Sequence, residues 1–386
     1  MNHSLYIAII MLVGLLGGKL ASKLKLPSVT GYIIFGMLLG PSFANVITKD
    51  MIKAFQFINQ IALGILAISI GAELHRAVFK RFGKTLFLIA FVDGIITAGS
   101  VALLTYFFGV PIEFAIILGV LAMTVSPSGV LSIIKEYQAK GSLTRTLLAL
   151  VAIENLNCIL LFGVASAVLV GLSNTDMKGI QLILMLVKEI SFAIIVGSLI
   201  GAIVAFVFKK KPNNSKLLVF LLGVILLNTG IANEFNLSAL LINMTTGAVL
   251  TNLINRKMVL SSTLERVELP IFVMFLTLAG AKLDVSILAT VGMVGAGYII
   301  GRLLGKIGGS YISSGFTSLE VKVRRNIGMA LTPQAGVAIG LSIIAEQKLP
   351  HSNGLITGIV LSGVIFFEVV GPLLLKKALK NTGDIY

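Results

Sequence analysis

The sequence predicts an all-α polytopic membrane protein with about thirteen transmembrane helices. Three observations support this fold class: the composition, the number of long apolar stretches, and the alternation of basic residues between successive loops. Hydrophobic residues make up 56% of the 386 residues, charged residues make up 12%, and the mean hydropathy is +1.01. A soluble domain carries about twice that charge fraction. The composition therefore excludes a soluble enzyme, a disordered chain and a nucleic-acid-binding domain, although the net charge is +15.

Each predicted helix is an apolar stretch of about the 20 residues that a helix needs to cross a bilayer. The second stretch is short, and the fifth and twelfth are interrupted. The first is not a convincing cleavable signal, because no Lys or Arg precedes it. The stretches are 5–22, 27–44, 54–74, 85–108, 112–134, 146–172, 180–208, 217–232, 237–255, 263–281, 285–313, 325–345 and 353–375.

The basic residues alternate between the loops that follow these stretches. Of the 31 Lys and Arg residues, 23 follow odd-numbered stretches and 5 follow even-numbered ones. A missed or invented span would scramble this alternation. The positive-inside rule then predicts a cytoplasmic C-terminus and an N-terminus outside. The remaining three, Lys188, Arg302 and Lys306, lie within predicted spans.

A short internal repeat indicates an inverted topology. Gly71-Ala72-Glu73-Leu74 closes the third span, and Gly280-Ala281-Lys282-Leu283 closes the tenth, 209 residues later. The same offset relates Asp93 to Arg302, both charged positions inside spans. Because seven spans separate the two copies, they point in opposite directions across the membrane. Such inverted repeats are a recurring plan of secondary transporters.

The fifth and twelfth spans are also seven apart, and both are interrupted in the middle by proline and glycine. Proline removes a backbone donor and clashes with the preceding turn. A matched pair of breaks predicts two crossing broken helices with a binding site at the bilayer midplane, whereas the alternative is two ordinary proline kinks. The residues concerned are Thr124, Ser126, Pro127, Ser128 and Gly129 in the fifth span, and Thr332, Pro333, Gln334 and Gly336 in the twelfth.

Ionisable groups inside the membrane are costly and require a reason. Glu154 is the deepest acid, and Lys306 is its natural partner from another span, either for proton exchange or as a static ion pair between helices. The remaining charges inside spans are Asp93, Arg302 and Glu368. Arg302 cannot deprotonate, so it is expected to be a structural counter-ion of Asp93 or Glu368.

Asn155 lies beside Glu154 and can offer a carbonyl oxygen to a cation, although a hydrogen bond between helices is nearly as reasonable. The hydroxyl and amide groups of the two breaks add neutral oxygens. Together with the carboxylate of Glu154 they suit a small monovalent cation in competition with a proton, since Mg²⁺ or Ca²⁺ would want more carboxylates. Cys158 is the single cysteine, and the three histidines are far apart, so no resident metal or other cofactor is expected.

Three motifs resemble the monovalent cation:proton antiporter family. Within that family, the sequence most resembles the electrogenic bacterial sodium/proton antiporters and the membrane domains of potassium-efflux-type antiporters. The motifs cover nearly the whole chain. They are the Leu-Pro…Gly-Pro opening of residues 26–41, the Leu269-Pro270-Ile271-Phe272 segment that continues to Gly280-Ala281-Lys282-Leu283-Asp284, and Leu331-Thr332-Pro333-Gln334-Ala335-Gly336-Val337-Ala338.

The resemblance implies the sodium/proton antiporter fold, a homodimer in the cell membrane, and a core that moves against a dimerisation part as an elevator. The implied dimerisation part is residues 1–80 and 215–282, the core is 84–172 and 285–379, and 180–208 is a linking helix. Lys306 matches the lysine of the electrogenic members. The implied partners are a monovalent cation (Na⁺, with K⁺ or Li⁺ also open), the proton and the lipid bilayer.

The sequence departs from the family at its acid pair. Electrogenic members carry Asp-Asp in the sixth span and electroneutral ones Asn-Asp, whereas this chain has Glu154-Asn155. Either Glu154 takes over both ion and proton, or a second acid such as Asp93 joins it, or the ion and stoichiometry differ.

Cation/proton antiport is the first functional hypothesis. The alternative from the same fold is a carrier of another solute, or an uncoupled cation pathway. An intramembrane enzyme is disfavoured, because no nucleophile with its base, paired aspartates or metal-binding histidine motif is present.

Overall fold

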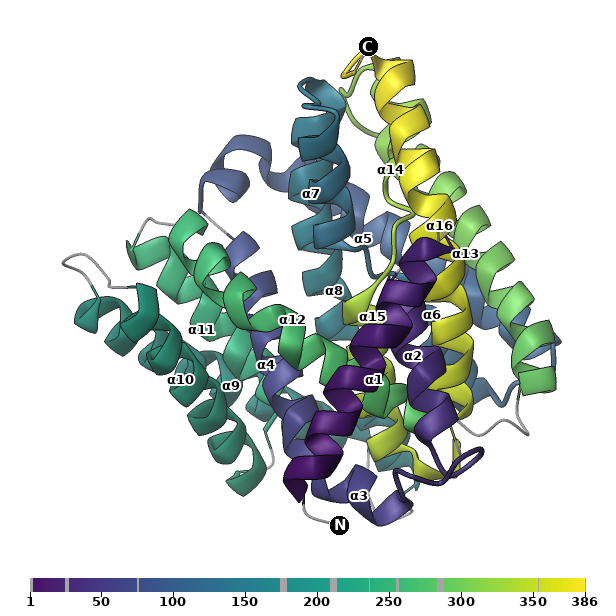
Figure 1. The fold of residues 1–386 in the computed structure, drawn as a ribbon. Helices are drawn as coiled ribbons and strands as arrows, with labels where there is room; N and C mark the ends of the chain where they lie inside the picture. Colours follow the sequence, from purple (N-terminus) through teal and green to yellow (C-terminus); the bar gives the residue numbers. More distant parts are fainter. Residues whose placement is uncertain are drawn as a thin grey trace. The chain divides into compact units, whose positions relative to one another are not determined.

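The computed structural model describes residues 3–24, 28–74, 76–173, 179–208, 214–235, 237–254, 257–282, 288–352 and 354–385. Within these ranges the regular structure is helical throughout (Figure 1). The chain divides into two compact units. Unit 1 comprises Met1–Ala77 and Asn174–Leu283, and unit 2 comprises Val78–Ser173 and Asp284–Tyr386.

Unit 1 is built from the first helices of the chain and a second group from its middle. Its helices are α1 (His3–Lys23), α2 (Ser28–Leu39), α3 (Lys49–Ala54), α4 (Gln56–Glu73), α9 (Gly179–Val207), α10 (Asn214–Glu234), α11 (Ala239–Ile254) and α12 (Lys257–Ala281). Helix α9, which the sequence predicts as a linking helix, falls within this unit. A dimerisation role for unit 1 stays a prediction.

Unit 2 contains both interrupted spans. Its elements are α5 (Arg76–Phe107), which starts at the boundary between the units, α6 (Ile112–Ala122), α7 (Pro127–Glu136), α8 (Ser142–Ser173), α13 (Leu288–Gly315), α14 (Val321–Ala330), α15 (Gly336–Lys348), the 3₁₀ turn η2 (Pro350–Ser352) and α16 (Leu355–Thr382). The pairs α6/α7 and α14/α15 are the predicted broken helices.

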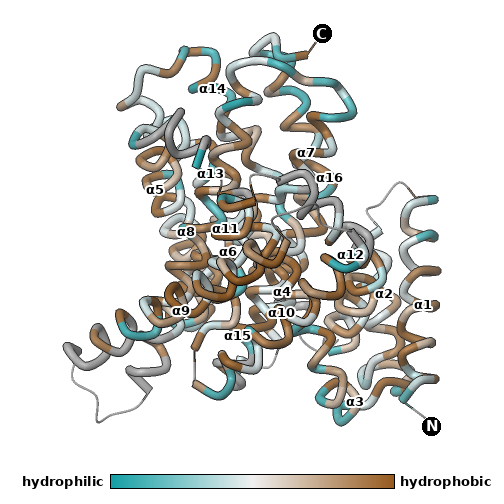
Figure 2. The backbone as a smooth tube through the Cα atoms, turned by 90° about the vertical axis from the view of Figure 1, so that its left-hand side faces the viewer, coloured by the Kyte–Doolittle hydropathy of each residue, from teal (hydrophilic) through white to brown (hydrophobic). Residues whose placement is uncertain are grey.

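A helix or a broken helix occupies each predicted apolar stretch, and the short α3 is an addition before the third. By length and composition, six helices in the described ranges could cross a membrane: His3–Lys23, Lys84–Phe107, Ser142–Ser166, Val187–Val207, Ser215–Glu234 and Leu355–Thr382. Figure 2 shows hydrophobic residues along the helices and hydrophilic ones at the end of unit 2 near the C-terminus. The protein is therefore a multi-span membrane protein, while the count of thirteen crossings stays a prediction.

Glycines let the helices of unit 1 cross closely at equivalent places in the two copies of the repeat. A methyl group at Gly71 of α4 would collide with the Met244 carbonyl of α11, and one at Gly280 of α12 would collide with the Ile33 carbonyl of α2. Small residues permit such approaches between membrane helices. The two glycines that reveal the repeat in the sequence therefore have the same packing role. Leu26, Pro27, Leu283 and Asp284 of the family motifs lie outside the described residues.

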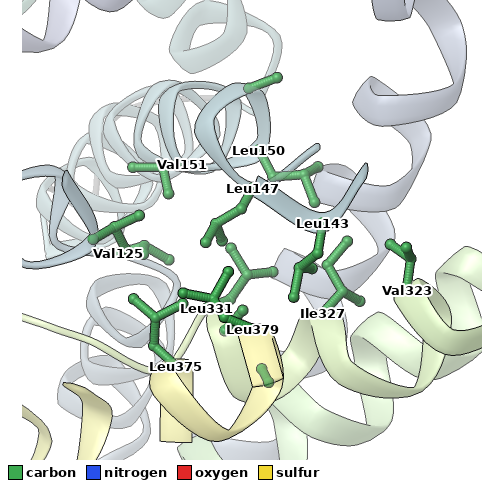
Figure 3. Packing of buried hydrophobic residues seen from close by; sticks show 14 of the residues in the cluster. Val125, Leu143, Leu147, Leu150, Val151, Val323, Ile327, Leu331, Leu375 and Leu379 are labelled. Carbon is green, nitrogen blue, oxygen red and sulfur yellow. The ribbon is translucent and has the colours of Figure 1, made fainter. Parts of the chain in front are cut away.

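The core of unit 2 orients the helix that carries Glu154. Leu143, Leu147 and Leu150 form an apolar stripe on α8 that packs among residues of α14 and α16, including Ile327 and Leu379 (Figure 3). Residues spaced by three or four positions share one face of a helix. Continuing the stripe by four residues reaches Glu154, so the packing that buries these leucines also turns the carboxylate inward.

The C-terminal segment caps the start of α8. Asp384 Oδ2 accepts hydrogen bonds from the backbone N–H and the hydroxyl of Thr144, each at 2.7 Å, and the Lys140 N–H donates to the Asp384 carbonyl at 3.0 Å. A carboxylate at a helix N-terminus satisfies a free donor and opposes the positive end of the helix dipole. Figure 1 shows the ends of α7, α14 and α16 together at this end of unit 2.

Replacing Asp384 should destabilise unit 2. We expect Asp384→Ala to lower the free energy of unfolding by about 1–2 kcal/mol, because the α8 N-terminus loses its acceptor. Thermal unfolding of the purified protein in detergent measures this. Asp384→Asn is the control, since an amide oxygen still accepts from Thr144, and equal melting temperatures for the alanine and asparagine variants would contradict the capping role.

Candidate functional site

The candidate site lies in unit 2, where the two interrupted helices meet. Helix α6 ends at Ala122 and α7 begins at Pro127, so Thr124, Val125 and Ser126 lie outside regular helix. The Ser126 hydroxyl accepts from the Gly129 N–H at 3.0 Å and Pro127 occupies the first turn of α7. Serine at the N-cap followed by proline is a strong helix-start signal. Pro127 thus begins a half-helix and is not a kink.

The second break is tied to the first by backbone and side-chain hydrogen bonds. The Ser126 N–H donates to the Pro333 carbonyl at 2.8 Å. Gln334 Nε2 donates to the Tyr298 hydroxyl at 2.8 Å and to Thr124 Oγ1 at 3.1 Å. Unwound backbone is tolerated at membrane depth only where such partners exist or water enters. The breaks predicted from the sequence are therefore a crossed pair, and the reading as two ordinary kinks is wrong.

Arg302 holds the carbonyl ends of both interrupted helices. Its guanidinium is fully buried and donates to the carbonyls of Ala122 at 2.9 Å, Thr124 at 2.7 Å and Thr332 at 2.7 Å. It also lies over the Phe367 ring at 4.3 Å from the centroid. A fixed cation neutralises the negative ends of α6 and α14, and the planar fork suits several acceptors at once.

The prediction that Arg302 is the counter-ion of Asp93 or Glu368 is wrong. Every guanidinium hydrogen bond described above goes to a carbonyl, and in the described part of the chain no ion pair joins Arg302 to either acid. The carbonyl ends of two half-helices carry partial negative charge, which is sufficient to hold a cation. One Glu368 carboxylate oxygen is buried without a hydrogen-bond partner among the described residues.

Lys306 lies between two carboxylates from different helices. Its ammonium group donates to Glu154 Oε2 of α8 at 2.5 Å and to Asp93 Oδ2 of α5 at 3.0 Å. All three side chains are fully buried. The Ser310 hydroxyl donates to the second oxygen of Asp93 at 2.7 Å. The other oxygen of Glu154 has no hydrogen-bond partner among the described residues.

A polar stripe on α13 brings these groups together. Tyr298, Arg302, Lys306 and Ser310 recur every four residues and are fully buried. Side chains at this spacing share a face of the helix. Tyr298 and Arg302 contact residues of the two breaks, whereas Lys306 contacts the carboxylates.

Asn155 ties α8 to the first break. Its amide nitrogen donates to the Val125 carbonyl at 2.8 Å and to the Val151 carbonyl at 2.9 Å, and its oxygen accepts from the Val125 N–H at 3.3 Å. The amide is fully buried. The sequence leaves two roles open for Asn155, a cation ligand or a hydrogen bond between helices. In the structure its amide makes hydrogen bonds between α8 and the first break.

The remaining predicted residues line the breaks. Thr124 and Thr332 turn their hydroxyls back to carbonyls of the preceding turn, Leu121 and Met329, at 2.8 and 2.7 Å. Gly336 begins α15, and the side chain of Ser128 lies outside the described residues. The carbonyl oxygen of Gln334 is buried without a hydrogen-bond partner in the described ranges, as is one oxygen of Glu154.

Three residues of the site are missing from the sequence prediction. They are Ser310, Tyr298 and Phe367, which contact Asp93, Gln334 and Arg302 respectively. The four-residue spacing from Arg302 and Lys306 could have revealed Tyr298 and Ser310. No sequence signal marks Phe367, because phenylalanine is common in apolar helices and does not by itself indicate a site.

This arrangement of crossed broken helices around buried charges defines a secondary transporter fold. A family model described as "Sodium/hydrogen exchanger, transmembrane" matches residues 7–380. The chain therefore belongs to the sodium/hydrogen exchanger family, as the sequence motifs indicate.

Solved structures agree with this assignment of the fold. Two structures of the sodium proton antiporter MjNhaP1 from Methanocaldococcus jannaschii are similar, with TM-scores of 0.79 and 0.68 and sequence identities of 16% and 18%. The first likeness covers 98% of each chain. The predicted fold class, an all-α membrane protein of the sodium/proton antiporter type, is thereby confirmed.

A curated relative matches part of the chain. The "Iron transporter MagA" of Paramagnetospirillum magneticum (strain AMB-1) is 28% identical over 132 residues, which is 34% of this chain. The match spans 30% of that relative's own length.

Arg302→Lys should weaken the crossing although it keeps the charge. An ammonium cannot reproduce the fork that reaches three carbonyls, so we expect the free energy of unfolding to fall by about 2 kcal/mol or more. Chemical denaturation in detergent micelles measures this change. Arg145→Lys, at an exposed position on α8, should change stability by less than about 0.5 kcal/mol. Equal effects of the two substitutions would exclude a special role for Arg302.

Proposed function

We propose that the protein is a secondary active antiporter that exchanges protons for a monovalent cation, with Na⁺ the first candidate and K⁺ and Li⁺ the next. The observation that carries this proposal is the burial and pairing of the Glu154 carboxylate. Its carboxylate is fully buried beside the crossing, with one oxygen on Lys306 and the other without a hydrogen-bond partner among the described residues. Membership of the sodium/hydrogen exchanger family supports the same reaction class.

Coupling arises because Glu154 cannot hold a proton and a cation at once. A buried carboxylate is stable when it is protonated or paired with a positive charge, and costly otherwise. Lys306 pairs with one oxygen of Glu154, and the other oxygen can take either a proton or a cation, which gives the site two occupied forms. Exchange follows if only these occupied forms cross between the two sides of the membrane.

The chemistry around Glu154 favours a small monovalent cation. Carboxylate and carbonyl oxygens are hard ligands, and Gln334 adds a buried oxygen near the same crossing. The ammonium group of Lys306 already neutralises part of the negative charge, which disfavours a divalent ion.

Alternating access in this proposal follows the elevator scheme. Unit 2 carries all the residues of the candidate site, so it would be the moving core, and unit 1 would form the contacts of a homodimer. The protein would lie in the cell membrane with its C-terminus in the cytoplasm and its N-terminus outside. The 23 basic residues that follow odd-numbered predicted spans support this orientation.

Cation-driven proton movement tests the proposal. Purified protein is reconstituted into proteoliposomes that contain a pH-sensitive dye, and Na⁺, K⁺ or Li⁺ is added outside. We expect one of them to drive protons across the membrane. Glu154→Gln should reduce the initial rate at least about tenfold, because a side-chain amide neither gains nor loses a proton near neutral pH. An Fe²⁺ arm is included because the partial relative is named an iron transporter.

Glu136→Gln is the matched control. Glu136 ends α7 at an exposed position, and the rate of this variant should equal that of the wild-type protein. Full activity of Glu154→Gln would remove Glu154 from the exchange. Flux that needs an organic solute, or cation flux without proton movement, would contradict antiport itself.

A further inference from the structure

The chain passes from unit 1 into unit 2 in the first turn of α5. The boundary between the units falls between Ala77 and Val78. Helix α4 ends at Glu73, and α5 begins at Arg76. Leu74 has φ −78° and ψ 54°, a ψ that lies outside the helical range. The passage between the units therefore follows directly on a break between two helices.

The local sequence does not explain this break. Residues 73–78 contain neither proline nor glycine, and most of them, including Glu73, Leu74, Arg76 and Ala77, are good helix formers. By propensity alone, α4 would continue into α5 as one helix. The break therefore depends on contacts from elsewhere in the fold.

Asn252 of α11 supplies these contacts. Its Oδ1 accepts a hydrogen bond from the Arg76 N–H at 2.7 Å, and its Nδ2 donates to the Leu74 carbonyl at 2.9 Å and to the Ala248 carbonyl at 2.6 Å. Helix ends leave backbone groups of this kind without partners. One side-chain amide thus caps the end of α4 and the start of α5 together, which requires a donor and an acceptor on the same side chain.

Helix α4 is held against α11 one turn before the break. A methyl group at Gly71 would collide with the backbone nitrogen of Ala248, the residue whose carbonyl Asn252 also contacts. Asn252, Ala248, Leu74 and Arg76 all belong to unit 1, whereas the residues of the candidate site belong to unit 2. The junction is therefore fixed on the side of unit 1.

We propose that Asn252 is a positioning residue that anchors this junction, so that α5 changes direction about a fixed point at Leu74–Arg76 when unit 2 moves. This inference rests on the proposed elevator antiport and adds a hinge to it. Hinges are usually a few residues at the ends of elements that absorb the change in backbone angles. Without the amide, both helix ends lose their partner and α5 takes many directions, few of which lead to the opposite-facing state.

Asn252→Leu tests the anchor because leucine is similar in size and makes neither hydrogen bond. In proteoliposomes, the initial rate of cation-driven proton movement should fall about tenfold, the factor expected for two ordinary hydrogen bonds. The Kd of the transported cation, measured by isothermal titration, should stay within about twofold of the wild-type value because the candidate site lies in unit 2.

Hydrogen exchange gives a readout that does not depend on transport. The peptide that contains Arg76 should exchange its amide hydrogens at least about fivefold faster in Asn252→Leu, while peptides of α8 and α13 keep their wild-type rates. Unchanged or slower exchange of the Arg76 peptide would overturn the anchoring role.

Asn243→Leu is the matched control, since it makes the same substitution on the same helix. Asn243 accepts a hydrogen bond from Asn228 of α10 at 2.9 Å, so its loss should lower the melting temperature and leave the junction intact. The transport rate should stay within about twofold of the wild-type rate. If Asn243→Leu slows transport as much as Asn252→Leu does, the effect is general destabilisation of unit 1 and the inference fails.

A second variant keeps the inference testable if Asn252→Leu does not fold. In Asn252→Asp the carboxylate still accepts from the Arg76 N–H but cannot donate to the Leu74 carbonyl. We expect the rate to fall about threefold and the Arg76 peptide to keep its wild-type exchange. A wild-type transport rate in the Asn252 variants would overturn the hinge and leave antiport intact. Absence of cation-driven proton movement in the wild-type protein would instead overturn antiport, and the exchange of the Arg76 peptide would still decide whether Asn252 anchors the junction.

Discussion

The candidate site depends on one interaction, the sharing of the buried ammonium group of Lys306 between Glu154 and Asp93. The three side chains come from α13, α8 and α5, and none of them is exposed. Removing one partner of a buried ion pair costs about 3–5 kcal/mol, because the other charge stays behind without compensation. The cluster is stable while its charges compensate one another. When one member changes its charge, a proton or a cation has to restore the balance.

Arg302, the second buried cationic side chain of α13, leaves Lys306 free to pair with the two carboxylates. Arg302 lies one turn away on α13, and its guanidinium is occupied by the carbonyl ends of the two interrupted helices and by the ring of Phe367. Arginine keeps its charge under all relevant conditions, whereas lysine can lose its proton. The planar guanidinium therefore holds the unwound backbone, and the ammonium group faces the carboxylates. Asn155 also serves the backbone, because its hydrogen bonds go to Val125 and Val151.

The sequence predicts the helices and both breaks because hydropathy, proline and glycine act locally along the chain. It also pairs Glu154 with Lys306, since few charges lie inside the spans and each needs a partner. Arg302 was assigned wrongly because every residue has a carbonyl, so no pattern shows which carbonyls a guanidinium will meet. The pairing of Asp93 with Lys306 depends on how closely α5 approaches α13 at Gly305 and Gly309, and this is a property of packing. Ser310 follows from that approach, although its spacing from Lys306 is visible in the sequence.

The central claim is that a cation and protons compete for the carboxylates around Lys306. Isothermal titration of the purified protein with Na⁺, in two buffers of different ionisation enthalpy, counts the protons released as the cation binds. We expect release of about one proton per Na⁺ bound in the wild-type protein and no proton-coupled binding in Glu154→Gln. Binding of Na⁺ with the same heat in both buffers, and hence without proton release, would contradict it.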